Sequence, residues 1–201
     1  MDFLKRNFHD IIRLYINQIG ITIFALMLYT ASGFPEDAVL VSKLRTAVSV
    51  FSLLFYFVLI YFVSWECGAK DKIRIDSGRV SAAPFKGGIM SLVANIPNLL
   101  FGIVSLILAI VCISGGESVQ GFFGIVFAIT MAHASMYMGI IQTFVYGFNL
   151  PDPDVPDMNK YLIMAVLFTL LPLISVAINQ LAYFLGSREI KLLSVFSKKN
   201  K

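Results

Sequence analysis

Seven polar side chains lie within otherwise apolar stretches of the sequence, where each must find a hydrogen-bond partner or serve a function. They are Asn17, Gln18, Asn95, Asn98, His133, Asn179 and Gln180. The histidine could relay a proton or contact a ligand, since imidazole titrates near neutral pH. General acid–base catalysis also needs a positioned partner, and the segment around His133 contains no acid. We therefore expect a hydrogen-bonded structural histidine, with a proton or ligand contact as the alternative.

The other six side chains are amides, and two interpretations of them stay open. They can make hydrogen bonds between helices, each worth about 0.6 kcal/mol. Alternatively, if both ends of the chain lie inside, all six share the cytoplasmic third of the membrane and line a shallow polar cavity open to the cytosol. A tail on the far side would exclude this cavity, because Asn179 and Gln180 would then lie away from the others.

Motifs typical of membrane enzymes are absent from the sequence. It has no HExxH zinc motif, no serine nucleophile element and no pair of aspartates within an apolar segment. We expect no enzyme, no catalytic residue and no cofactor. Cys67 and Cys112 stand alone, so neither a metal site nor a disulfide is expected. The basic residues flank apolar segments in separate clusters, which argues against nucleic acid as a partner.

The composition places most side chains in lipid. Hydrophobic residues make up 58% of the 201-residue chain and charged residues 14%, against about 25% charged in soluble domains. The sequence predicts an all-α fold, a polytopic helical membrane bundle forming one domain over 1–201 with a cytoplasmic N-terminus. Five apolar segments reach the roughly 20 residues that a crossing takes. They are 14–32, 46–65, 88–113, 121–147 and 161–185.

Both ends of the chain have the pattern of membrane-surface segments. Apolar residues recur at helical spacing through 1–13, with basic and polar residues on the other face. This predicts an amphipathic interfacial helix leading into the first span. The basic tail, 186–201, mixes the same residue types and is expected to lie on headgroups as well.

The stretch WECGAKDKIRIDSGR, 65–79, is dense in charge and connects the second and third segments. We expect a cytoplasmic loop whose basic residues set the topology and attract anionic headgroups. The interspersed acids favour a second interpretation, specific docking of a partner. A ligand or phosphate site is a third. The docking candidates are Trp65, Glu66, Lys70, Asp71, Lys72, Arg74, Asp76 and Arg79.

The distribution of Lys and Arg raises a question of topology. Five crossings put the two ends on opposite sides, and the cytoplasmic excess of basic residues is then weak. With both ends inside the excess is strong, but one segment must then enter and leave on the same side. The candidate is the third, because Pro97 removes a backbone donor and Asn95 and Asn98 could satisfy the freed groups. The plainer interpretation is a proline-kinked helix that crosses.

Small residues line one face of the fourth segment at helical spacing, which predicts a single continuous helix. Such a stripe lets a neighbouring backbone come close, either within the chain or from a second copy. The stripe consists of Gly121, Gly124, Ala128, Ala132, Ser135 and Gly139.

Three stretches of the first half are NQIGITIFALML (17–28), YFVSWECGAKDKIRIDSGR (61–79) and SLVANIPN (91–98). They resemble stretches of a group of small, uncharacterised multi-pass membrane proteins of Gram-positive bacteria. The second half is similar only in general character. The resemblance implies a bacterial cytoplasmic membrane, and it implies no substrate.

The functional expectation is a non-enzymatic membrane subunit or regulator. It would dock a membrane or cytoplasmic protein through 65–79 and pack or dimerise through the fourth segment. The alternative is a small-solute transporter, or the substrate-binding membrane subunit of one, with the seven polar side chains as pocket groups. For either function, the expected partners are the lipid bilayer, a membrane or cytoplasmic protein and a second copy of the chain.

Overall fold

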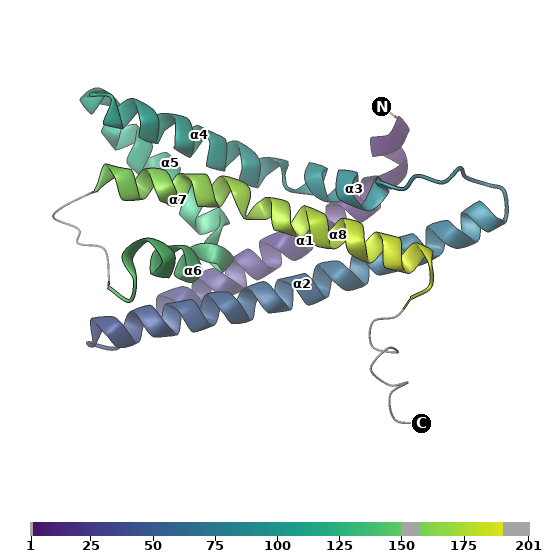
Figure 1. The fold of residues 1–201 in the computed structure, drawn as a ribbon, viewed down its shortest axis with the longest axis horizontal. Coiled ribbons are helices and arrows are strands. Elements are labelled where there is room, and N and C mark those ends of the chain that lie inside the picture. Colours follow the sequence, from purple (N-terminus) through teal and green to yellow (C-terminus); the bar gives the residue numbers. More distant parts are fainter. Residues whose placement is uncertain (1, 150–156, 191–201) are drawn as a thin grey trace. The chain divides into compact units, whose positions relative to one another are not determined.

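The computed structural model describes residues 2–149 and 157–190, which are helical apart from short connections (Figure 1). This confirms the predicted all-α class. The tail beyond residue 190 lies outside the described residues. The helices are α1 (Asp2–Ala31), α2 (Ala38–Asp76), α3 (Lys86–Ala94), α4 (Ile96–Ile113), α5 (Gln120–His133), α6 (Ser135–Tyr146), α7 (Met158–Leu170) and α8 (Pro172–Ser187), with a 3-10 turn η1 (Glu117–Val119) before α5.

Four helical runs among the described residues are long and apolar enough to cross a membrane. They are α1, α2, α4 and the run Met158–Ser187, which joins α7 and α8. A fifth span exists only if α5 and α6 are counted together, and these two helices meet at 113°. The chain is therefore a polytopic helical bundle, as predicted.

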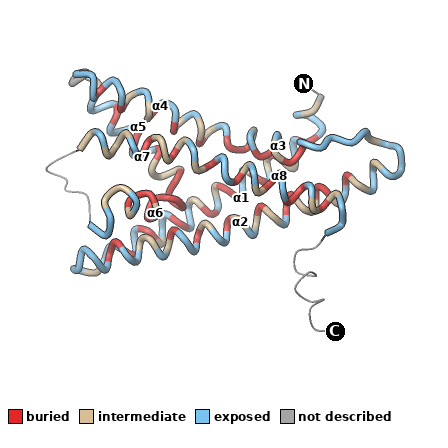
Figure 2. The backbone as a smooth tube through the Cα atoms, in the orientation of Figure 1, coloured by how far each residue is buried: buried red, intermediate tan, exposed pale blue. Residues whose placement is uncertain are grey.

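Exposed side chains on these helices have the character of a lipid-facing surface. Phe51 and Leu54 of α2 and Leu100 and Ile107 of α4 are each more than half exposed. Figure 2 shows such exposed positions alternating with buried ones along the helices. Large apolar side chains are unfavourable in water and neutral in hydrocarbon, so these surfaces suit a bilayer.

The helices group into two compact units. The first unit contains residues 1–17, 57–94 and 173–201, and the second contains 18–56 and 95–172. The first therefore holds the start of α1, the end of α2, α3 and nearly all of α8. The second holds the rest of α1 and α2 together with α4 to α7. A single membrane domain over 1–201 stays a prediction.

The prediction of one continuous helix over 121–147 is wrong, because the fourth segment is sharply bent at Ala134. The bend contains no proline or glycine. The α1 side chain of Thr22 donates from Oγ1 to the freed carbonyl of His133 at 3.2 Å. Ser135 donates from Oγ to the Thr22 carbonyl at 2.7 Å. This exchange with α1 satisfies polar groups that would otherwise be unpaired in hydrocarbon.

The third segment is also interrupted, at Asn95 between α3 and α4. Asn95 has φ −90° and ψ 0°, and Pro97 lies in the first turn of α4. Proline is tolerated there because the first backbone donors of a helix have no partner within the helix. The segment is therefore broken at Asn95, and α4 alone is long and apolar enough to cross a membrane. Whether the segment crosses or re-enters on the same side stays a prediction.

The stretch 65–79 is not a loop, because α2 continues as a helix to Asp76. Its 39 residues span about 58 Å at 1.5 Å per residue, well beyond a hydrocarbon core of about 30 Å. The charged last turns therefore extend the helix past the lipid. The turn comes later, at Gly78, whose φ of 71° favours glycine. Near the N-terminus, α1 is a single helix. It has no break at the predicted boundary between the interfacial helix 1–13 and the first span 14–32.

Candidate functional site

The predicted docking stretch is an ordered part of the first unit. Asp71 is buried, and its Oδ2 accepts hydrogen bonds from Lys86 Nζ at 2.6 Å and Tyr183 Oη at 2.9 Å. Arg74 lies 3.6 Å from its other carboxylate oxygen. A buried carboxylate must be paired in this way to stay charged. Asp71 therefore joins α2, α3 and α8, and neither Lys86 nor Tyr183 was among the predicted site residues.

Other charges of this stretch are paired at the surface of the unit. Glu66 bonds Arg13 of α1 at 2.8 Å and Lys70 at 2.7 Å. These hydrogen bonds hold the pKa of the Glu66 carboxyl below its usual value. The Lys72 ammonium lies 3.3 Å from the carboxylate of Glu189, which follows the end of α8. The Arg13 and Glu189 pairs therefore connect this helix end to α1 and to the residues after α8.

The three remaining predicted docking residues are Trp65, Asp76 and Arg79. The indole of Trp65 donates to the Ile190 carbonyl at 2.8 Å. Asp76 and Arg79 form no ion pair with another described residue. Asp76 also lines a shallow groove of about 330 Å³ between the end of α2 and α8. This groove, with Lys72 and Arg188 on its walls, is called the docking groove below.

The predicted polar residues fall into both units. In the first unit, Asn179 accepts from Ser64 and donates to Ser91 Oγ at 2.8 Å. Gln180 accepts from the Gly88 amide and donates to the Pro84 carbonyl, each at 2.7 Å. These two side chains thus make the predicted hydrogen bonds between helices. Asn17 lies at the end of the α1 part of this unit and is partly exposed.

The remaining four belong to the second unit. Gln18, Asn95 and Asn98 are buried there. The Gln18 Oε1 and the Asn98 Nδ2 have no hydrogen-bond partner among the described residues. The His133 ring packs on Phe101, with centroids 5.1 Å apart. A cytosolic cavity shared by the six amide side chains stays a prediction.

The small-residue stripe is divided by the bend. Gly121 and Gly124 of α5 face open space. Gly139 of α6 packs directly on the backbone of Arg45 in α2, and its amide donates to Ser49 Oγ at 2.7 Å. Ala128 faces the cavity described next, Ala132 is half-buried on α5 and Ser135 bonds α1. Close helix packing through the stripe is therefore present at Gly139.

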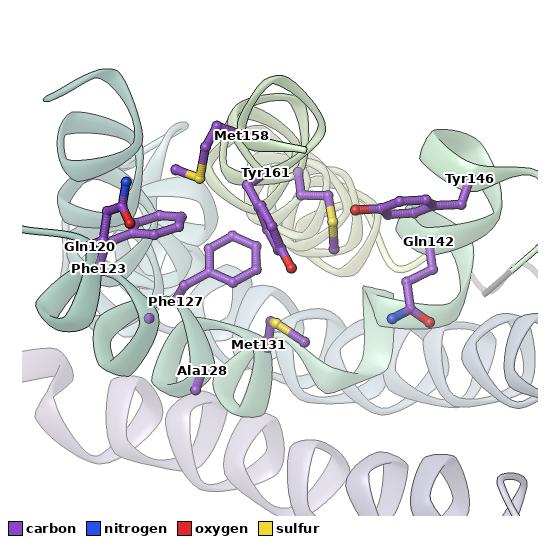
Figure 3. Close-up of a pocket in the computed structure, with 11 residues that line it drawn as sticks. Gln120, Phe123, Phe127, Ala128, Met131, Gln142, Tyr146, Met158 and Tyr161 are labelled. Atoms are coloured by element: carbon purple, nitrogen blue, oxygen red, sulfur yellow. The ribbon is translucent and has the colours of Figure 1, made fainter. Parts of the chain in front are cut away.

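The bend creates a cavity in the second unit, which sequence reasoning missed. It has a volume of about 370 Å³ and lies between α5, α6 and α7 (Figure 3). We call it the aromatic cavity. Tyr161 extends from α7 beside Phe127, their centroids 5.2 Å apart and their rings nearly perpendicular. Phe123 meets Tyr161 in the same edge-on way at 6.0 Å. The remaining wall includes Met131, Met158 and Met164.

A few polar groups reach the same space. Gln142 of α6 accepts a hydrogen bond from Tyr29 on its Oε1, which leaves its amide NH2 without a partner among the described residues. Tyr146 lines the cavity as well, and Lys160 lies 4.8 Å from its ring centroid. An apolar cavity with a few directed polar groups is the usual form of a small-molecule site. The signal in the sequence was weak, because Gln142 and Tyr146 reach α5 and α7 only through the bend.

No carboxylate, histidine or cysteine is among the residues that line the aromatic cavity. The described residues also contain no cluster of three His, Cys, Asp or Glu that could hold a metal ion. The lining of the aromatic cavity offers a ligand aromatic contacts and hydrogen bonds.

No protein-family model, curated protein or solved structure matches the chain.

Proposed function

We propose that this multi-pass membrane protein is a non-enzymatic binding protein that holds a small, largely apolar molecule in the aromatic cavity. It would act as a transporter or as the substrate-binding membrane subunit of one. The observation that supports this proposal is the cavity itself, about 370 Å³ between α5, α6 and α7. Small-molecule sites have volumes of roughly 300–1,000 Å³.

The lining defines the class of ligand. Edge-on pairs of Phe123 and Phe127 with Tyr161 offer faces and edges on which a flat ring can pack. The methionines adapt to irregular shapes and contact aromatic rings favourably. The free amide of Gln142 can donate to a carbonyl. A neutral ring system with one hydrogen-bond acceptor satisfies these groups.

Two glycines of α5 provide a matched test. Both have open space around an added Cβ, but Gly124 lines the aromatic cavity and Gly121 does not. The full chain in phosphatidylcholine nanodiscs would be titrated with 2-acetylnaphthalene, a neutral bicyclic ketone, and the Kd measured by equilibrium dialysis. Gly124→Leu should weaken binding at least about tenfold, or 1.4 kcal/mol. Gly121→Leu should bind as the unaltered chain does. Equal uptake by both variants and by empty nanodiscs would refute the proposal.

A second candidate function, a membrane subunit or regulator that docks a protein partner, is supported by the docking groove. Lys72 and Arg188 lie on its walls beside Asp76, and apolar Ile75 and Phe184 lie between them. The mixed charges suit a partner segment with acids opposite Lys72 and Arg188, a base opposite Asp76 and an apolar residue between them. The bacterial cytoplasmic membrane is the proposed location, supported by the resemblance of the first half.

Tagged purification from native membranes tests this second candidate. Asp76→Lys and Arg188→Glu change charges of the groove that form no ion pair among the described residues. Each should remove a stoichiometric partner that accompanies the unaltered chain. Lys70→Gln is the control, because Lys70 does not line the groove and pairs with Glu66. A chain that purifies without any protein partner would contradict docking.

A further inference from the structure

A second pocket, which is partly open, lies in the first unit. It has a volume of about 260 Å³ and is formed by the start of α1, the end of α2, the connection before α3, and α8. We call it the polar pocket. Arg6, Asn7, Asp71, Ser81, Lys86 and Tyr183 bring polar groups to it. Apolar walls come from Phe3, Ile75, Val80 and Ala83.

The charges of the polar pocket do not cancel. Asp71 is 4% exposed and already accepts from both Lys86 and Tyr183. Its charge is therefore neutralised within the protein. Lys86 is 8% exposed and gives one of its three N–H donors to Asp71. Arg6 forms no ion pair with another described residue. The pocket therefore has an excess of one positive charge.

This balance selects the ligand. A cation would be repelled by Arg6 and Lys86. The carboxylate that lines the pocket, Asp71, is already hydrogen-bonded. An anion would meet the free donors of Lys86, the guanidinium of Arg6 and the hydroxyl of Ser81. Charge-assisted hydrogen bonds of this kind to phosphate oxygens are among the strong ones. The remaining N–H donors of a buried lysine also need partners, which an oxyanion supplies.

We propose that the polar pocket binds a phosphate group, either the headgroup of an anionic phospholipid or a free phosphate. The apolar walls formed by Phe3, Ile75 and Val80 suit the glycerol and first acyl carbons of a lipid. Basic pockets between membrane helices at the cytoplasmic side are typical sites for anionic headgroups. The pocket lies at the end of the first unit that holds the charged turns of α2, which is where headgroups are expected.

The experiment uses the full chain reconstituted in nanodiscs of equal parts phosphatidylglycerol and phosphatidylcholine. After extraction in mild detergent, retained lipid is measured by mass spectrometry. Phosphatidylglycerol should be enriched about tenfold over phosphatidylcholine, which corresponds to 1.4 kcal/mol. Arg6→Gln should abolish most of this enrichment. The exposed Arg6 has no ion pair with another described residue, so the variant is expected to fold. Lys5→Gln, which removes the neighbouring exposed cation outside the pocket, should retain it.

A second arm separates the two sources of phosphate. The chain in nanodiscs of phosphatidylcholine alone is heated with and without millimolar inorganic phosphate. A rise in Tm that is lost in Arg6→Gln, without lipid enrichment, identifies free phosphate as the occupant and supports the site. Enrichment that Lys5→Gln reduces as much as Arg6→Gln reflects general surface charge and overturns the proposal. Absence of both enrichment and a phosphate effect in the unaltered chain overturns it as well.

Discussion

The indole Nε1 of Trp65 donates a hydrogen bond to the carbonyl oxygen of Ile190 at 2.8 Å. This bond places the residues after α8 beside the last turns of α2. In the same unit, Arg13 of α1 bonds Glu66 of α2 at 2.8 Å. The start of the chain, the charged end of α2 and the start of the tail therefore share one end of the first unit.

The chain is expected to have both ends on one side of the membrane. Four crossings by α1, α2, α4 and the run Met158–Ser187 give this result if α5 and α6 together enter and leave on the same side. Both ends inside also give the stronger excess of cytoplasmic Lys and Arg. Fusion of fluorescent protein or alkaline phosphatase to Lys201 measures the side. We expect fluorescence and no phosphatase activity, and an active phosphatase would refute the arrangement.

Close packing of α2 on α8 should make Gly68 intolerant of any side chain. A Cβ there would overlap the Tyr183 carbonyl and lie 2.8 Å from the Ser187 nitrogen, and both are backbone atoms. Gly68→Ala should therefore lower the free energy of unfolding by about 1–3 kcal/mol, as overpacking does. The measurement is unfolding in mixed micelles by increasing SDS.

Gly20→Ala is the matched control for Gly68→Ala. A Cβ at Gly20 of α1 would have nothing within 4 Å. Because alanine favours a helix over glycine by up to about 1 kcal/mol, this variant should be as stable as the unaltered chain or more stable. Equal effects of the two substitutions would show that the contact between α2 and α8 contributes little.

Features governed by local composition could be predicted from the sequence. The apolar segments, the interruption beside Pro97 and the glycine turn at Gly78 each have a local cause. The bend at Ala134 has none, because it depends on hydrogen bonds with Thr22, more than a hundred residues away in sequence. The aromatic cavity depends on that bend and could not be predicted either.

The same distinction explains the charged stretch. Its position outside the lipid followed from its composition, but its role depended on partners supplied by the fold. Asp71 is paired with Lys86 and Tyr183, which come from α3 and α8. Charge density alone cannot separate a solvated loop from a helix end with internal ion pairs. The sequence therefore identified the charged end of α2. It did not indicate that Arg6 and Lys86 lie beside this helix end in the polar pocket.

Asp71 and Lys86 should be strongly coupled in stability. Removing Asp71 leaves the Lys86 ammonium buried without its ion pair, and removing Lys86 leaves Asp71 with only the longer Arg74 contact at 3.6 Å. Loss of one partner of a buried ion pair typically costs about 3–5 kcal/mol. Asp71→Leu and Lys86→Met should each destabilise the chain to this extent. The double variant should lose well under the sum, because an apolar pair replaces the ion pair. A double-mutant cycle by SDS unfolding measures the coupling, and additive losses would show that the two charges are independently solvated.

The bend between α5 and α6 should depend on the hydrogen bonds that α1 supplies. Thr22→Val removes the donor to the His133 carbonyl, and Ser135→Ala removes the donor to the Thr22 carbonyl. Hydrogen bonds in membrane proteins contribute about 0.6 kcal/mol on average and up to about 1.7. Thr22→Val should lose an amount in the upper part of this range, because the His133 carbonyl lies at a helix break. Ser135→Ala should lose about the average, because the Thr22 carbonyl lies within α1.

Thr30→Val provides the comparison, because the Thr30 hydroxyl bonds the Leu26 and Met27 carbonyls of its own helix and no other described residue. Its loss should change the free energy of unfolding by less than about 0.5 kcal/mol, as surface substitutions usually do. The Thr22 and Ser135 variants should also weaken binding of 2-acetylnaphthalene, because the bend brings Gln142 and Tyr146 to the aromatic cavity. Destabilisation without any change in that Kd would mean that the cavity keeps its form without the contacts to α1.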